Sequence, residues 1–473
     1  MVHTPLNLLL LAVTGLGMAL LGSAHAAPTE LPPTVAAALL RAKIPGTAIA
    51  LYVQDVNQNE PTLKFNSERA MNPASVMKLL TTYAALEVLG PAYRWRTEVY
   101  SQGAWKGEQL NGDLIFKGQG DPKITLEAFW LMLRELRHKG LKDLRGNLVL
   151  DRSYFNLTAE DPSAFDNEPF KPYNLGPDAL LINFRAHRVR FLAQADNTSP
   201  RIVVDPEILG IPLRNEIKLG NGPCGDWREK IRLQLGASLL FSGQFPLACE
   251  DKSMNLVLQD NNAYFSALFK QLWEQLGGTW QGRVVEGKLS NNAVRLATFE
   301  SPQLAEIIRD INKFSNNVMA RHLFLTLGAE IRGIPTDSAK SADAVNDWLA
   351  VKGQRFLELV LDNGSGLSRS ERINAQHLAW LLRAAFHSNV FAELESSLPI
   401  VAVDGTMKKR LVLGNVSGHA HIKSGSLKDV RAMAGYVFNA QGRRMVVVCI
   451  INHANADQAS PVQDALLEWV FGR

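Results

Sequence analysis

The chain has 473 residues, which is too long for one ordinary hydrophobic core and indicates two or three domains. Hydrophobic residues make up 46% and charged residues 20% of the sequence, a composition that is typical of folded proteins and excludes a disordered chain. The net charge of +4 is small for this length, so the composition does not predict a nucleic-acid-binding protein.

The first 26 residues have the pattern of a signal peptide. The apolar stretch "LNLLLLAVTGLGMALLGSAHA" ends in Ala24-His25-Ala26, a small-x-small cleavage signal. No lysine or arginine precedes the stretch, so a retained membrane anchor is the alternative. Three glycines interrupt the apolar run, and we therefore expect export with cleavage near Ala26.

The segment that follows predicts a helix over 34–44 and then a β-hairpin with its turn at 57–60. After the hairpin, "NPASVMKLL" begins a helix that carries Ser75 and Lys78 three residues apart. On a helix this spacing places both side chains on one face. A lysine with a lowered pKa can activate a serine as a nucleophile. The alternative is a serine in the first helical turn and a lysine that reaches the solvent.

Residues 97–290 differ from the flanking sequence in their predicted secondary structure, which is mainly short strands. Short strand patterns such as "GDLIFKG", "GNLVLDRSYF", "ALLINF" and "RIVVD" alternate with glycine, proline, asparagine and aspartate, and one clear helix is expected at 125–140. Helices return after residue 291, followed by three strands near 420–427, 431–439 and 443–452 and a final helix from Ser460. We expect residues 27–96 and 291–473 to form one α/β domain, interrupted by a β-rich insertion.

The three cysteines differ in context. Cys449 lies in an apolar run and is expected to be a buried strand thiol. Cys224 and Cys249 lie in loop sequence, and an oxidising compartment favours a disulfide between them, with two free thiols as the alternative.

Two further motifs follow in the second half of the chain. "SNN", from Ser315 to Asn317, interrupts an amphipathic helical pattern, and it is either a capped helix junction or a loop that directs a hydroxyl and an amide into a cleft. "KSGS", from Lys423 to Ser426, lies on an expected strand. Gly425 within that strand indicates close approach of a ligand, whereas an edge strand with a charged residue is the alternative.

The order Ser-x-x-Lys, Ser-x-Asn, Lys-Ser-Gly resembles that of the active-site serine penicillin-recognising enzymes. The 240 positions between Ser75 and Ser315 leave room for the insertion, as in the class C low-molecular-mass penicillin-binding proteins, the D-alanyl-D-alanine carboxypeptidase/endopeptidase family. "GQGDP", "PYNLGPDALLINF", "DNGSGLSR" and "VDGTMKKR" are also similar to that family. The resemblance implies an α/β (α+β) fold: a β-lactamase/transpeptidase-like domain with an antiparallel sheet flanked by helices, interrupted by an insertion that forms two additional domains.

The resemblance also implies residue roles. Ser75 is the nucleophile that forms an acyl-enzyme, Lys78 its base, Ser315 a proton relay and Lys423 a group that tunes the local potential. Asn317 binds the substrate amide, and the remaining motif residues, Ser424, Gly425 and Ser426, bind substrate. Ser424 holds the terminal carboxylate with Lys423, and the amide of Ser426 completes an oxyanion hole with that of Ser75. Ser424 stands where threonine is commoner in the family, so the hydroxyl is kept and a methyl group is lost.

The expected partners are peptidoglycan stem peptides in the periplasm, with β-lactams as inhibitors and no nucleic acid. No metal or other cofactor is expected. Peripheral membrane contact through Arg185, Arg188 and Arg190 is an alternative to an ordinary solvated strand face. Two other functions stay open: a serine β-lactamase, and an envelope protein that binds peptidoglycan without turnover.

Overall fold

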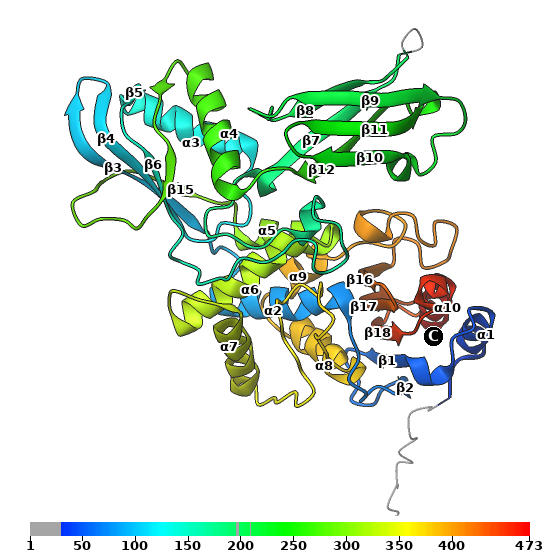
Figure 1. Cartoon of the computed structure of the whole chain (residues 1–473). Helices are drawn as coiled ribbons and strands as arrows, with labels where there is room; N and C mark the ends of the chain where they lie inside the picture. Colours follow the sequence, from blue (N-terminus) through cyan, green and yellow to red (C-terminus); the bar gives the residue numbers. More distant parts are fainter. Residues whose placement is uncertain (1–29, 195–197, 209) are drawn as a thin grey trace, which may run out of the picture.

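The computed structural model describes residues 30–194, 198–208 and 210–473, and the predicted signal peptide lies outside these ranges. Figure 1 shows a lower part built from the two ends of the chain and an upper part built from its middle. Within the described ranges, no helix has the length and apolar character needed to cross a bilayer.

A five-stranded antiparallel sheet forms the centre of the lower part, in the order β16-β17-β18-β1-β2. The sheet joins the N-terminal hairpin to the three C-terminal strands, and Leu51 on β1 lies opposite Cys449 on β18. Cys449 is a fully buried free thiol, as predicted. The strands are β1 (Ile49–Asp55), β2 (Leu63–Phe65), β16 (Ala420–Leu427), β17 (Val430–Phe438) and β18 (Arg444–Asn452).

Helices cover both faces of this sheet, which explains why β1 and β18 are continuous apolar runs rather than alternating ones. Ala50 and Tyr52 of β1 face one hydrophobic cluster, whereas Ile49, Leu51 and Val53 face the other. The first cluster contains side chains of α2 (Lys78–Leu89), α5 (Leu304–Lys313), α6 (Asn317–Arg332), α7 (Ser338–Val351), α8 (Ala375–Phe386) and α9 (Phe391–Ser397). The second contains side chains of α1 (Pro33–Arg41) and α10 (Ser460–Phe471). This arrangement confirms the α/β fold with an antiparallel sheet between helices.

The upper part contains a seven-stranded mixed sheet with two helices, α3 (Leu126–His138) and α4 (Asn261–Gln275), packed on it (Figure 1). Its long strands are β3 (Arg96–Lys106), β4 (Gln109–Gly118) and β15 (Val294–Glu300). Its short strands are β5 (Asp143–Leu144), β6 (Leu148–Asp151), β13 (Thr279–Trp280) and β14 (Val284–Glu286). Because β15 pairs with β3 up to Glu300, we propose that the insertion ends after Glu300 and not at residue 290.

Two three-stranded sheets form the remainder of the insertion. One consists of β7 (Ala186–Leu192), β8 (Arg201–Asp205) and β12 (Asp251–Val257), and the other of β9 (Leu213–Gly220), β10 (Ile231–Leu235) and β11 (Leu239–Pro246). Aromatic side chains fill the space between them, including Phe191, Trp227 and Phe245. A disulfide joins Cys224 to Cys249 in this region, which confirms the predicted pairing.

Two sequence-based expectations in the insertion need correction. "ALLINF" is not a strand: Asn183, Phe184 and Arg185 have φ values of 48°, 52° and 47°, which are incompatible with an extended backbone. The basic stretch also does not present three arginines on one strand face. Arg188 is exposed and Arg190 pairs with Asp251, but Arg185 precedes β7 and lines a separate cavity.

Candidate active site

Ser75 lies in a single 3-10 turn, Ala74–Met77, which leads directly into α2. The Asn72 side chain holds this entry: its Oδ1 accepts from the Ala74 amide at 2.9 Å, and its Nδ2 donates to the Ser368 carbonyl at 2.8 Å. Ala74 has a φ of 46°, a costly conformation for a residue with a side chain. The Asn72 contacts therefore fix a strained turn that carries the serine.

Lys78 is the first residue of α2 and is fully buried. Its Nζ donates to Ser75 Oγ at 3.0 Å and to Asn317 Oδ1 at 2.7 Å, and it also contacts the Ser365 carbonyl oxygen. All three partners are neutral. The predicted serine–lysine pair is thus in hydrogen-bond contact, and the lysine does not reach the solvent.

The surroundings of Lys78 favour its uncharged form. Burial holds the pKa of Lys78 well below its usual value, and the nearby Lys423 lowers it further, whereas Glu371 acts in the opposite direction. Glu371 does not contact the lysine. Its Oε1 accepts from the backbone amides of Gly364 at 2.8 Å and Asn363 at 3.1 Å. A neutral amine has only two N–H groups, which the Asn317 and Ser365 oxygens can accept. Its lone pair is then directed at Ser75, so in the uncharged form the bond reverses and Lys78 accepts the hydroxyl proton.

The "SNN" motif is a capped helix junction, and it also directs polar side chains into the cleft, so both interpretations of its sequence apply. Asn316 caps α6, because its Oδ1 accepts from the Met319 amide at 3.0 Å. Ser315 precedes the cap with a φ of 57°, and its Oγ accepts from Lys423 Nζ at 2.9 Å. Asn317 begins α6 and binds Lys78. The junction between α5 and α6 therefore directs a hydroxyl and an amide toward the two lysines.

Lys423 lies on β16, which is an edge strand of the central sheet. The side chain is fully buried, and Nζ donates to Ser315 Oγ and to the Ser424 carbonyl at 2.7 Å. Burial lowers the pKa of Lys423 to about 7. β16 is therefore both an edge strand and part of the candidate site. Its free edge faces the turn that carries Ser75.

Two glycines allow the serine turn to lie against its neighbours. A Cβ atom on Gly425 would lie 2.7 Å from the Pro73 carbonyl oxygen and 3.0 Å from the Ser75 nitrogen. A Cβ on Gly366 would lie 1.9 Å from the Ala74 carbonyl oxygen. Both distances are too short for a side chain, so the strand and the "DNGSGLSR" loop approach the nucleophile only as glycine backbone.

These elements surround a cavity of about 300 Å³. Ser75 and Ser315 line one end of it, and Ser424 lines the strand side, where its Oγ lies 2.8 Å from Thr406 Oγ1. Arg410 and Arg431 also line the cavity, and each is paired with an aspartate, Asp464 and Asp457. The hydroxyl groups and guanidinium groups of the lining are suited to a small polar acyl compound. Its other lining residues are Met407, Gly425, Ser426, Ala432, Ser460 and Gln463.

The structure brings together all eight residues that the sequence singled out, and it adds five that the motifs did not identify. Across the described ranges, no group of three or more histidine, cysteine, aspartate or glutamate side chains is placed to hold a metal ion. The "DNGSGLSR" and "VDGTMKKR" stretches were the available signal for three of the five, Ser365, Gly366 and Thr406. The added residues are Asn72, Ser365, Gly366, Glu371 and Thr406.

The insertion reaches the loop that supports the serine turn. The guanidinium of Arg369 lies 4.5 Å from the ring centroid of Phe165, an insertion residue, and donates to the Lys428 carbonyl at 3.3 Å. Arg369 follows Gly366 by three residues. The insertion is therefore in contact with the loop that lies against the serine turn.

The comparisons with known proteins cover nearly the whole described chain. The model of the D-Ala-D-Ala carboxypeptidase 3 (S13) family matches residues 31–471. The D-alanyl-D-alanine carboxypeptidase DacB of Haemophilus influenzae is 28% identical, over 96% of this chain and 95% of the relative. The D-alanyl-D-alanine carboxypeptidase of Actinomadura sp. is also 28% identical, over 97% of this chain and 88% of the relative.

The fold of the chain is also found in a solved structure. The crystal structure of penicillin-binding protein 4 (DacB) from Haemophilus influenzae superposes with a TM-score of 0.78 at 23% identity, covering 93% of this chain and 99% of the other. The resemblance inferred from the three motifs is therefore confirmed. The chain belongs to the D-Ala-D-Ala carboxypeptidase 3 (S13) family and is a serine-type hydrolase.

Proposed function

We propose that the protein hydrolyses the D-Ala-D-Ala bonds of peptidoglycan stem peptides through an acyl-enzyme on Ser75. The hydrogen bond between Lys78 Nζ and Ser75 Oγ, at 3.0 Å, carries this proposal. It supplies a nucleophile and a base already in contact, and the burial of Lys78 favours the uncharged form that the base requires.

The reaction begins when Ser75 Oγ attacks the carbonyl carbon of the penultimate D-Ala and gives its proton to Lys78. The peptide C–N bond then breaks, and the leaving amine takes a proton. Ser315 is placed for that transfer, because its hydroxyl is held by Lys423. Water hydrolyses the resulting ester and regenerates the Ser75 hydroxyl.

Two further groups orient the substrate. Ser424 lines the cavity beside Thr406, and with Lys423 it is placed to hold the terminal carboxylate. The backbone amides of Ser75 and Ser426 supply the oxyanion hole. Each such donor is worth about 3–4 kcal/mol in comparable sites. Gly425 keeps these two segments at backbone contact distance.

The same nucleophile accounts for inhibition by β-lactams, whose strained amide acylates Ser75 in place of the peptide. The Haemophilus influenzae structure is also known as a complex with a β-lactam. Export with cleavage near Ala26 delivers the enzyme to the periplasm, where its substrate lies.

The proposal is tested with two substrates, a pentapeptide stem and a cross-linked muropeptide dimer, analysed by mass spectrometry. We expect loss of one D-Ala from the first, conversion of the second to monomers, or both, and we expect benzylpenicillin to abolish the reaction. Substrates that stay intact would contradict it. An acyl-enzyme with benzylpenicillin that hydrolyses within milliseconds would instead favour a β-lactamase.

A further inference from the structure

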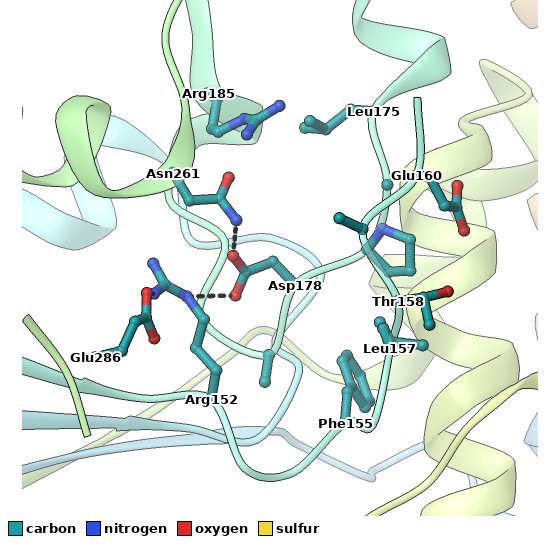
Figure 2. A pocket seen from close by; sticks show the side chains of 14 residues that line it. Arg152, Phe155, Leu157, Thr158, Glu160, Leu175, Asp178, Arg185, Asn261 and Glu286 are labelled. Carbon is teal, nitrogen blue, oxygen red and sulfur yellow. Dashed lines mark hydrogen bonds and ion pairs between the residues drawn. The ribbon is translucent and has the colours of Figure 1, made fainter. Parts of the chain in front are cut away.

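A second cavity, of about 470 Å³, lies where the insertion meets the catalytic part (Figure 2). Its walls come from the segments around 152–160 and 175–185, the first turn of α4 and the end of β14. It contains none of the residues that line the Ser75 cleft. Its size is that of an ordinary small-ligand site.

The acidic side chains of this cavity already have partners. Asp178 accepts from Arg152 Nε at 2.9 Å and also contacts Asn261. Glu286 pairs with Arg152, and Glu160 pairs with Arg321 of α6. Figure 2 shows Arg152 and Asn261 meeting at Asp178. The carboxylates are therefore neutralised by the protein.

Arg185 is different. Its guanidinium extends across the cavity toward Leu175 in Figure 2, and it makes no hydrogen bond or ion pair with any residue that the structure describes. Burial lowers the pKa of Arg185, and the nearby Asp178 and Asp260 raise it, but an arginine stays charged in either case. A half-buried guanidinium without a partner favours an anion.

Three buried polar atoms without a described partner belong to residues that line this cavity: Arg152 Nη2, Arg185 Nε and Asn261 Oδ1. Two are donors and one is an acceptor. Inorganic phosphate would use only the donors. A peptide offers a carboxylate to the arginines and an N–H group to Asn261, and its side chains fit the apolar wall of Phe155, Leu157, Leu175 and Pro177.

One helix connects this cavity to the reacting groups. His322 of α6 is buried behind the cavity and holds its wall: Nε2 accepts from the Asp178 amide at 3.2 Å, and Nδ1 donates to the Gly120 carbonyl at 3.1 Å. The same helix begins at Asn317, which binds Lys78, and five residues of helix rise only about 7.5 Å. The same helix therefore supports both the cavity wall and the Ser75 site, an arrangement that fits a substrate with two stem peptides.

We propose that this cavity is a second ligand site, which binds the C-terminal carboxylate of the neighbouring stem peptide in a cross-linked substrate. The inference rests on the proposed function, because it assumes a peptidoglycan substrate. It assigns Arg185 to the carboxylate and Asn261 to a peptide N–H group, with no chemical step at this site.

The test is calorimetric titration of the full chain after its active site has been blocked with benzylpenicillin. The ligands are a cross-linked muropeptide dimer and the same dimer with its free C-terminal carboxylate amidated. We expect the first to bind and the second to bind about tenfold more weakly or worse, because the charge-assisted hydrogen bond is lost. Arg185→Gln should cause the same loss, whereas the exposed Arg188→Gln, three residues away, should not.

Equal binding of the two dimers, or of wild type and Arg185→Gln, would overturn the second site. Inorganic phosphate that displaces the dimer at equal concentration would also overturn it, because the site would then be one for free anions. The mass of the penicillin-treated chain is recorded first. Absence of an adduct would contradict the acyl-enzyme proposal, whereas an adduct without dimer binding would contradict the second site alone.

A second variant tests the cavity independently, in case Arg185→Gln does not fold. Thr158 is exposed at the edge of the cavity, so Thr158→Trp should occlude the cavity without disturbing the core. We expect it to weaken dimer binding about as much as Arg185→Gln, while the penicillin adduct still forms and reports a folded chain. Unchanged dimer binding in Thr158→Trp would place the ligand elsewhere.

Discussion

The Ser75 cleft and the Arg185 cavity both bury basic side chains, but the cleft uses lysines and the cavity uses arginines. The cleft uses Lys78 and Lys423, which are fully buried and bound to neutral oxygen atoms. The cavity uses Arg152, which is paired with carboxylates, and Arg185, which has no partner among the described residues.

This difference between lysine and arginine implies different roles for the two sites, proton transfer in the cleft and ligand binding in the cavity. A buried lysine loses its proton readily, because desolvation penalises the ammonium form, and it can then act as a base. An arginine keeps its charge when it is buried, so it binds anions but does not transfer protons. The cleft is therefore equipped for proton transfer and the cavity only for binding. Substitutions in each part of the molecule can confirm or break this division.

Ser75→Ala removes the nucleophile of the cleft. We expect no covalent adduct with fluorescent penicillin and no release of D-Ala, because no other hydroxyl is hydrogen-bonded to Lys78 Nζ within the described chain. Gel fluorescence and mass spectrometry measure the adduct. Ser396→Ala, at an exposed helix position, is the matched control and should label normally. Labelling of Ser75→Ala would refute the assignment of the nucleophile.

Lys78→Met and Lys78→Arg separate charge from proton transfer. General-base catalysis contributes about 100-fold to 10,000-fold, so we expect acylation by penicillin to slow by that range in both variants. Lys78→Arg keeps a cation and should not recover the rate, because arginine does not deprotonate. Stopped-flow acylation measures the rate, with the partly exposed Lys64→Met as control. A normal acylation rate in Lys78→Arg would contradict the assignment of Lys78 as the general base.

The pKa of Lys423, about 7, predicts how recognition of a carboxylate depends on pH. Lys423 is charged below about pH 7 and neutral above it, so its attraction for the carboxylate of benzylpenicillin should fall as the pH rises through 7. We expect the affinity for benzylpenicillin to decline above pH 7, whereas that for its methyl ester should not. Inhibition constants from pH 6 to pH 9 measure this, and parallel profiles for the two compounds would contradict it.

The disulfide of the insertion should affect stability and leave the chemistry intact. Replacement of Cys224 and Cys249 by serine removes a cross-link that is worth about 2–4 kcal/mol in typical proteins. We expect a lower temperature of thermal unfolding in calorimetry, with acylation within about twofold of wild type because proton transfer lies in the other part. The buried Cys449→Ser is the comparison, since it changes a thiol of the catalytic sheet. A large loss of acylation in the double variant would show that the insertion shapes the cleft.

The sequence predicted the site better than it predicted the insertion, for a physical reason. Ser75 and Lys78 are one helical turn apart, and Ser315 and Asn317 flank a helix cap, so local geometry constrains each pair. Only the resemblance to a family indicated that these pairs meet Lys423. The central sheet was predictable because apolar runs at both ends of the chain have few alternative structures.

The remaining features depend on contacts between distant residues. Arg185 lies in a basic stretch that is typical of a strand face, and its turn into a cavity follows from three successive positive φ values that no local pattern predicts. β15 follows a loop and resembles the start of the catalytic part, yet it pairs with β3 about 200 residues earlier. Ser365 contributes its backbone carbonyl, and any residue type can do that.

The most direct test of the account is the pKa of Lys78 itself. NMR of the chain with isotope-labelled lysine, assigned with Lys78→Met, would follow its ε-carbon across the pH range. The account predicts a signal that titrates well below about 10.4, the value of an unperturbed lysine. A Lys78 signal that titrates together with the surface lysines would show a charged amine beside Ser75, and it would contradict the proposed base.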